Sequence, residues 1–224
     1  MKEGRDYSLV FHINERYGEL KNEISSIHTL EEFSSSGAVR KAVLFDFLQI
    51  GELLNHLSEE FVLGFGESEI DKVIAVRNRI VHGYGGVKDE IIFRSLMFEL
   101  YPFIERINNY ARERYFSHLK SLIGQNINVT IDSCNKFDAI IDNCSIVYGY
   151  TSALTNLVGT FQDVIVLSKN KFDSFFSGVV EAVLFDKNLK SCIAVICEEK
   201  HDDVYGKLVS FLKTANNIEY EIVK

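Results

Sequence analysis

The 224-residue sequence has one proline, no tryptophan and no apolar run that approaches the roughly 20 residues of a membrane span. Its first residues, 1–6, are charged, and the apolar stretch of a signal peptide does not follow them. We therefore expect a cytoplasmic protein that has no membrane partner.

Cysteine is also scarce and is confined to the second half of the chain. The four cysteines form no CxxC pair, and Cys192 and Cys197 lie within one apolar run. Cysteines in such a setting are more often buried free thiols than zinc ligands or a disulfide framework. We therefore predict no metal site and no cofactor.

Positive charge is in deficit, because the formal net charge is −8. This balance argues against a broad basic surface of the kind that coats nucleic acid. A few arginines in a narrow cleft can still bind phosphate on an acidic protein. RNA therefore remains open as a substrate.

Arginine is absent after Arg114, and the hydrophobic period changes at about the same place. A chain of this length can form one large domain or two small ones. We expect two, with a boundary near Lys120. The predicted domains cover residues 1–119 and 120–224.

The first half has apolar residues at spacings of three and four, which is typical of amphipathic helices. Glycines at 83, 85 and 86 should end the third helix, and Pro102 should bend the fourth. Four long helices with short links predict an antiparallel bundle. The predicted helices span residues 7–27, 39–62, 68–81 and 88–122.

The second half has short runs rich in β-branched residues, bounded by Asn, Asp, Ser, Gly or Lys. Strands so closely spaced predict a small barrel or sandwich with a C-terminal helix. The fold class is therefore α+β in two domains. The predicted strands span residues 128–131, 139–141, 145–148, 163–167, 178–185, 191–196 and 218–223, with a helix over 202–215.

One segment has residue types that suggest chemistry rather than packing. It runs from Arg77 to Tyr84 and reads RNRIVHGY. Cleavage of RNA without a metal needs a group that takes the 2′-hydroxyl proton and a group that stabilises charge on the phosphate. Histidine titrates near neutral pH and suits the first task, and the arginine fork suits the second. Arg77 and His82 are the candidates.

The spacing of these two residues leaves several interpretations open. On a regular helix they lie about 140° apart and do not share a face. The helix could unwind at the glycines, or two copies of it could pair along Val73, Val76 and Ile80 and share a cleft. The segment could also be a capping cluster with no catalytic role.

The segment resembles the Arg-x4-His-x-Tyr motif of the HEPN superfamily. Ile50-Gly51-Glu52 matches the Ile-Gly-Glu of its HepT-like branch, and Ile74 fits the apolar lead-in to the motif. Glu99-Leu100-Tyr101-Pro102 resembles the Leu-Pro segment of the last helix. The likeness covers about residues 5 to 115.

HepT-like proteins are toxins of type VII toxin–antitoxin pairs. The resemblance implies a four-helix fold, a homodimer with a composite cleft and metal-independent cleavage of RNA, with tRNA one candidate substrate. It implies that Arg77 and His82 are catalytic and that Asn78 supports them. It also implies that a nucleotidyltransferase-type antitoxin adenylylates Tyr84, which would block RNA by bulk and by negative charge.

Glu52 has two interpretations. It could orient Arg77 across the bundle, since Gly51 would let the two helices approach closely, or it could be a solvated charge. Asp46 is a weaker candidate for the same role. We expect His12 and His56 to be surface or packing residues.

The second half resembles the barrel of inorganic pyrophosphatases from about residue 120 to 215. Those enzymes hold several magnesium ions with clustered aspartates. Here Asp163 stands almost alone, and Asp132 and Asp186 are weak candidates. We expect a barrel that has lost its metals and serves antitoxin binding, dimer placement or RNA positioning. An alternative for the whole chain is a non-catalytic interaction protein built from two degenerate enzyme domains.

Overall fold

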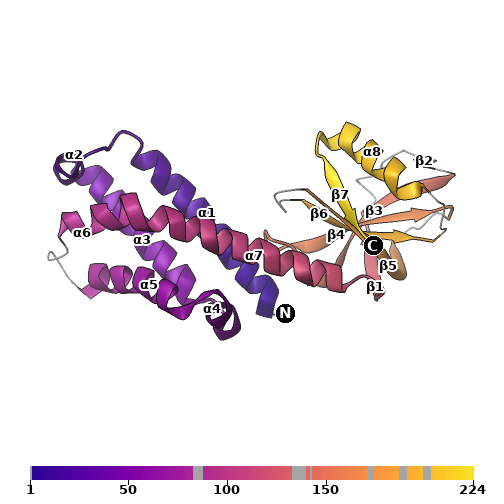
Figure 1. Ribbon diagram of the computed structural model, residues 1–224, viewed down its shortest axis with the longest axis horizontal. Coiled ribbons are helices and arrows are strands. Elements are labelled where there is room, and N and C mark those ends of the chain that lie inside the picture. The colour runs from indigo at the N-terminus through magenta and orange to yellow at the C-terminus, as the bar shows by residue number, and fades with distance from the viewer. Residues whose placement is uncertain are drawn as a thin grey trace. The chain divides into compact units, whose positions relative to one another are not determined.

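The computed structural model describes residues 2–82, 88–132, 140–141, 143–170, 174–186, 191–198 and 203–224. Helices occupy the N-terminal part and a sheet the C-terminal part, which confirms the predicted mixed α+β class (Figure 1). The chain divides into two compact units, Lys2–Ala111 and Arg112–Lys224. Since this division lies inside a helix, the last turns of that helix belong with the sheet unit.

The main helices of the helical unit run in alternate directions along the chain, as the labels α1, α3, α5 and α7 show in Figure 1. Their buried apolar side chains, such as Ile13, Phe47 and Ile104, form the core of the unit. Each such side chain stabilises the fold by about 1.5–3 kcal/mol relative to exposure. The elements are α1 (Lys2–Glu23), α2 (Leu30–Ser35), α3 (Gly37–Asn55), α4 (Glu59–Phe65), α5 (Glu67–His82), α6 (Asp89–Arg94), the π-helical η1 (Ser95–Leu100) and α7 (Tyr101–Ser121).

The predicted helix over 39–62 is wrong in one respect, because α3 ends at Asn55 and a separate helix, α4, begins at Glu59. The break is held by a contact from far along the chain. The buried carboxylate of Asp6 accepts hydrogen bonds from Ser58 N at 2.8 Å and from Ser58 Oγ at 2.6 Å. Ser58 Oγ in turn accepts from Phe61 N, which caps α4.

Two further irregularities have local causes. The short helix α2 was not predicted, although Thr29 and Glu32 form a capping box whose spacing is visible in the sequence. A π-helical turn, η1, ends two residues before Pro102, which lacks the N–H that would bond the carbonyl four residues earlier. The proline thus coincides with a widened helical turn, and the bend expected there stays a prediction.

The strands of the sheet unit pair in a closed circuit. The order is β1, β3, β4, β6 and β5, and β5 pairs back with β1. The β4–β6 pair is parallel, and the other pairs of the circuit are antiparallel. Outside the circuit, β2 pairs with β3 and β7 pairs with β5. The strands are β1 (Asn126–Ile131), β2 (Ile140–Ile141), β3 (Cys144–Thr155), β4 (Phe161–Ser168), β5 (Phe175–Asp186), β6 (Cys192–Cys197) and β7 (Tyr220–Val223).

Helix α8 (Val204–Asn216) covers part of one face of this sheet. Its buried residues Val204, Leu208 and Leu212 pack in one apolar cluster with strand residues such as Ile165 and Leu184. Cys144, Cys192 and Cys197 are buried free thiols, as expected, and Cys134 lies outside the described residues. The apolar residues of α8 and of the strands thus form the core beneath the helix.

A buried amide joins α7 to the sheet. Gln162, fully buried, accepts a hydrogen bond from the hydroxyl of Tyr115, and its Nε2 donates to the carbonyl oxygens of Cys192 at 2.8 Å and Asp163 at 3.0 Å. Phe116, on the same helix, packs against Phe185 with ring centroids 4.4 Å apart. These contacts explain why the end of α7 belongs with the sheet unit.

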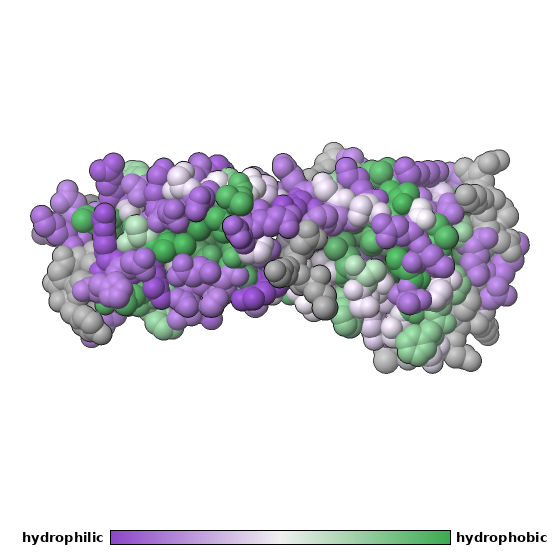
Figure 2. Space-filling view, turned by 90° about the horizontal axis from the view of Figure 1, so that it is seen from below, coloured by the Kyte–Doolittle hydropathy of each residue, from purple (hydrophilic) through white to green (hydrophobic). Residues whose placement is uncertain are grey.

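The surface of the two units differs in polarity. On the face drawn in Figure 2, hydrophilic side chains cover most of the helical unit, whereas the sheet unit shows larger pale and apolar areas. Among the described residues, no helix combines the length and the apolar character that a membrane span requires.

Candidate functional site

The described part of the motif predicted from the sequence, Arg77 to His82, lies on the last two turns of α5. This helix has acidic Glu67 and Glu69 in its first turn and basic Arg79 and His82 in its last, an arrangement that complements the helix dipole. Ile70 is buried against the core of the unit and fixes the rotation of the helix. The rotation decides which motif side chains face α3 and which face solvent.

Arg77 faces α3 and is held there by two partners. Its Nη2 donates to Glu52 Oε2 on α3, and its Nη1 donates to Asn78 Oδ1 at 3.0 Å. The Arg77 side chain is 24% exposed and that of Glu52 is 47% exposed. The structure thus brings Arg77, Asn78 and Glu52 together and places Glu52 as the partner that orients the guanidinium.

Gly51 makes this contact possible. A Cβ atom at that position would lie 2.5 Å from Cβ and 2.6 Å from Cγ of Arg77, closer than real Cβ contacts. The stem of Arg77 therefore crosses α3 directly over the glycine, and Glu52, the next residue, meets the guanidinium. The Ile-Gly-Glu spacing has this physical basis.

The Arg77 guanidinium keeps hydrogen-bonding capacity. It has five N–H donors, two of which are used by Glu52 and Asn78. Each terminal nitrogen retains one N–H. Nε is buried and has no hydrogen-bond partner among the described residues. An incoming anion can therefore reach Arg77 through its two terminal nitrogens.

His56 is a surface residue, as expected, and it also contacts this cluster. Its Nε2 lies 3.4 Å from Glu52 Oε1, so the Glu52 carboxylate faces both His56 and Arg77. The signal was available in the sequence, because residues four apart on a helix are neighbours. His56 is exposed, as is Glu52 in part, so the ring is accessible to solvent.

His82 lies elsewhere on α5. The helix continues through His82, and the side chain is exposed. Regular helical geometry then places it about 140° around the axis from Arg77. The structure shows α5 as helical as far as His82, and both unwinding at the glycines and pairing of two copies of the helix stay predictions. Tyr84 and the glycines at 83, 85 and 86 lie outside the described residues.

The prediction that Asp46 could orient Arg77 is wrong. Asp46 is 4% exposed and lies near Glu19, Glu23 and Arg16 of α1. Burial, together with the negative charges of the neighbouring Glu23 and Glu19, raises the pKa of its carboxyl to about 6. Asp46 is one and a half turns from Glu52, and that rotation turns it from α5 toward α1.

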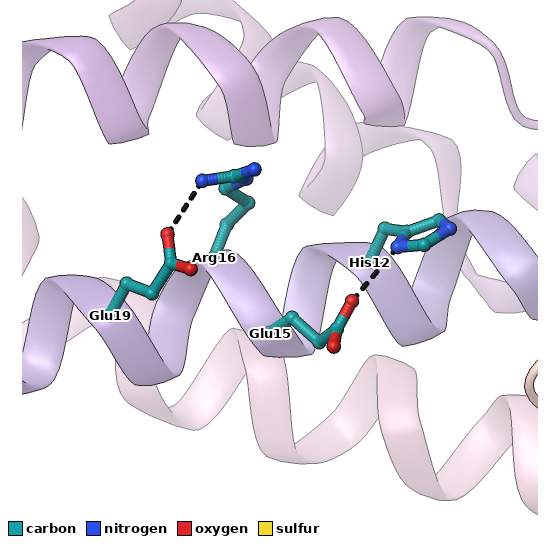
Figure 3. A network of polar contacts seen from close by, with 4 residues as sticks. All are labelled: His12, Glu15, Arg16 and Glu19. Atoms are coloured by element: carbon teal, nitrogen blue, oxygen red, sulfur yellow. Dashed lines mark hydrogen bonds and ion pairs between the residues drawn. The ribbon is translucent and has the colours of Figure 1, made fainter.

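The surface of α1 carries local ion pairs rather than a site (Figure 3). His12 Nδ1 lies 2.9 Å from Glu15 Oε2, and Arg16 Nη1 lies 2.5 Å from Glu19 Oε2. Both pairs are exposed, and pairs of this kind contribute about 0–1 kcal/mol. His12 is therefore a surface residue, as expected.

A groove of about 730 Å³ follows another face of α5 and is bordered by α6, η1 and α7. Its walls include the half-buried Val73 and Val76 and the exposed ring of Phe98. Two of the three residues expected to form an apolar seam, Val73 and Val76, therefore line one groove. Ile80 is half-buried but is not part of its lining.

The charges that line this groove are unbalanced. Glu69 pairs with Arg106, and Glu99 lies 3.7 Å from Arg94. Lys72 and Arg79 also line the groove, and neither forms an ion pair with a described residue. The groove thus combines apolar walls with a local excess of positive charge on an acidic protein.

The aspartates considered as metal ligands in the sheet unit have other partners. Asp163 Oδ1 accepts a hydrogen bond from the Tyr148 hydroxyl at 2.5 Å, and Asp186 Oδ2 accepts one from Ser191 N at 2.6 Å. Burial raises the pKa of Asp163, while the Tyr148 hydrogen bond lowers it. In the described part of the chain, no three His, Cys, Asp or Glu side chains group as a metal site would require.

Comparison with known proteins agrees with the helical geometry. Residues 13–110 match the family model described as Ribonuclease HepT-like. No curated protein and no solved structure matches the chain. The match spans α3 and α5, including the Glu52–Arg77 contact, and stops before the sheet unit. Residues 13–110 are therefore a HepT-like unit of the HEPN superfamily, a family of ribonucleases.

Proposed function

We propose that this protein is a ribonuclease toxin of a type VII toxin–antitoxin pair and that it cleaves RNA without a metal. The observation that carries the proposal is the contact of Arg77 with Glu52 over Gly51, inside the HepT-like unit. A guanidinium fixed on one side and open on the other is suited to binding a phosphate.

The chemical properties of the side chains suggest the role of each residue in the proposed reaction. Arg77 would bind the scissile phosphate and stabilise the charge that develops on it, while Asn78 and Glu52 hold the guanidinium in place. His82, which is exposed, would take the proton of the 2′-hydroxyl. The 2′-oxygen then bonds to the phosphorus and forms a 2′,3′-cyclic phosphate. The bond from the phosphorus to the 5′-oxygen of the next nucleotide breaks, and that oxygen takes a proton from water.

The angle between Arg77 and His82 supports a composite cleft in a homodimer. Because α5 is helical through His82, each cleft would take its arginine from one chain and its histidine from the other. The groove lined by Val73, Val76 and Phe98 offers the apolar surface that a second copy would cover. A two-fold axis would build two such clefts per dimer.

We propose that the modification that inhibits RNA cleavage occurs on Tyr84, two residues after His82. Adenylylation by a nucleotidyltransferase-type antitoxin would add a negative charge beside the phosphate site and repel RNA. A mass measurement of the protein co-expressed with such an enzyme tests this, with Tyr84→Phe as the control that should take up no adenylyl group.

An RNA cleavage assay tests the central proposal. Purified protein, free of antitoxin and unmodified, should cleave cellular RNA, with tRNA among the first substrates to try. Arg77→Ala and His82→Ala should each abolish cleavage and growth inhibition. His12→Ala, another exposed helical histidine, should have no effect.

Mixing the two inactive variants distinguishes a shared cleft from a cleft within one chain. Random exchange of subunits should restore about a quarter of the wild-type activity, because half of the dimers then contain one intact composite cleft. If no activity is recovered, the hypothesis of a composite cleft is rejected. Absence of cleavage by the wild type would instead favour a non-catalytic interaction protein.

A further inference from the structure

The sheet unit has an uncharged, aromatic hollow that the ribonuclease proposal does not use. It measures about 460 Å³, and its lining residues are aromatic or carry hydroxyl or amide groups. Phe161 is 53% exposed and Phe175 is 76% exposed, so two large rings face water. We call this hollow the aromatic surface; its principal residues are Asn128, Thr130, Tyr150, Phe161, Phe175 and Ser177.

Strand register aligns this surface. Thr130 of β1 is the partner of Tyr150 on β3 and also of Phe175 on β5. Residues directly opposite each other on paired strands point to the same face. On the far side of Tyr150, the ring of Phe161 stacks with ring centroids 5.7 Å apart and planes at 15°. The register partner of Tyr150 on β4 is Asp163, and Phe161 lies two residues earlier on that strand. Phe175, Thr130, Tyr150 and, on the diagonal, Phe161 therefore lie side by side across four neighbouring strands.

The polar groups lie beside these rings. Asn128 and Ser177 are register partners, and the Ser177 hydroxyl donates to Asn128 Oδ1 at 2.6 Å. The Asn128 amide nitrogen thus points its donors elsewhere, and the Thr130 hydroxyl lies in the adjacent row. A flat apolar group with hydrogen-bonding edges fits this combination, because no charged side chain is among the residues that line the hollow.

A nucleobase is such a ligand. Base stacking on exposed aromatic side chains is the common way in which proteins bind single strands without strong sequence preference. In a duplex the faces of the bases are covered by their neighbours, so a stacking surface selects single strands. One type of barrel, a partly open Greek-key barrel of five strands, uses the face of its second and third strands for oligonucleotides or oligosaccharides. Here those strands of the circuit are β3 and β4, which carry Tyr150 and Phe161.

We propose that the aromatic surface binds the bases of single-stranded RNA and so gives the sheet unit a substrate-binding role. The choice of RNA over another ring-bearing polymer, such as an oligosaccharide, rests on the proposed ribonuclease function of the helical unit. Tyr150, Phe161 and Phe175 are the stacking residues, and Asn128 and Thr130 are the groups that meet the base edges.

Binding of a short 2′-O-methyl oligouridine to the full chain tests the proposal. This RNA lacks the free 2′-hydroxyl that cleavage needs, so binding is measured without turnover. Phe161→Ala and Phe175→Ala should each weaken binding about five- to 150-fold, the range expected for loss of one base–aromatic stack. Phe45→Ala, which removes a ring of similar exposure (55%) from α3, should leave binding unchanged.

Two further probes complete the test. An abasic oligomer of the same length, which keeps the phosphates but loses every stack, should bind to the wild type more weakly than the uridine oligomer binds to Phe161→Ala. A neutral oligosaccharide should not compete. The proposal is overturned if the wild type does not bind the uridine oligomer, if both phenylalanine variants bind like the wild type, if the abasic oligomer binds equally well, or if the oligosaccharide displaces the RNA.

This test is separable from that of the ribonuclease proposal. If binding depends on Phe161 and Phe175 but no RNA is cleaved, the aromatic surface stands and the catalytic assignment fails. If His82→Ala abolishes cleavage but the phenylalanine variants change neither binding nor the KM for long RNA, the catalytic assignment stands alone.

Discussion

Replacing Gly51 with alanine tests the contact on which the candidate site depends. The new Cβ would lie 2.5 Å from Arg77 Cβ, whereas ordinary contacts begin at 3.4 Å. The Arg77 Cβ is bonded to the backbone of α5 and cannot rotate away. Helices α3 and α5 must therefore separate by about 1 Å, a displacement that a close-packed interior resists.

The magnitude follows from two opposing effects. Overpacking of this kind costs about 1–3 kcal/mol, while alanine in place of glycine inside a helix contributes about 1 kcal/mol of stability. The expected result for Gly51→Ala is a net loss of about 0–2 kcal/mol. Gly18→Ala is the matched control, because Gly18 also lies within a helix and has nothing within 4 Å of the new Cβ. It should gain about 0.5–1 kcal/mol.

Thermal unfolding followed by circular dichroism, together with RNA cleavage, measures both consequences. At about 5 °C per kcal/mol for a unit of this size, the two variants should differ in Tm by roughly 3–15 °C. Cleavage by Gly51→Ala should fall about 100-fold, the usual effect of a 1 Å displacement of a catalytic group. Equal gains in Tm for both variants, with full activity in both, would refute the close-approach argument.

Two other changes separate orientation from stability. Glu52→Gln should lower cleavage on the order of tenfold, because Arg77 loses its charged partner. It should change the free energy of unfolding by less than about 1 kcal/mol, since Glu52 is half-exposed. Unchanged cleavage would show that Glu52 is a solvated charge. The folded-state pKa of Asp46, about 6, exceeds its ordinary value of 3.8, so the folded state binds the proton more tightly and stability falls as pH rises between them. Asp46→Asn should therefore reduce this loss of stability and raise the free energy of unfolding above pH 6 by about 1–2 kcal/mol, after allowance for solvent screening. Urea unfolding at several pH values measures the effect. A steeper loss of stability with pH in the variant would contradict the predicted direction.

Local patterns predicted most elements of the fold. The apolar periods of three and four residues placed α1, α3, α5 and α7, and the β-branched runs placed each strand from β1 to β7, although the run over 145–148 covers only the first part of β3 (Cys144–Thr155). Both patterns depend only on neighbours along the chain. The break between α3 and α4 did not follow from them, because it is stabilised by Asp6, 52 residues from Ser58.

The sequence by itself determined which residue types are available for chemistry: Arg77, Asn78 and His82 on one helix, with Ile-Gly-Glu on another. It also implied the HepT-like family, which the match over residues 13–110 shows. Only the tertiary structure decided that Glu52, 25 residues away, faces Arg77 while Asp46 faces α1. It likewise decided that β5 pairs back with β1 and brings Phe175 into one row with Tyr150. Helix rotation and strand order are set by the packing of distant segments, and strand pairing uses backbone hydrogen bonds that are the same for nearly every residue type.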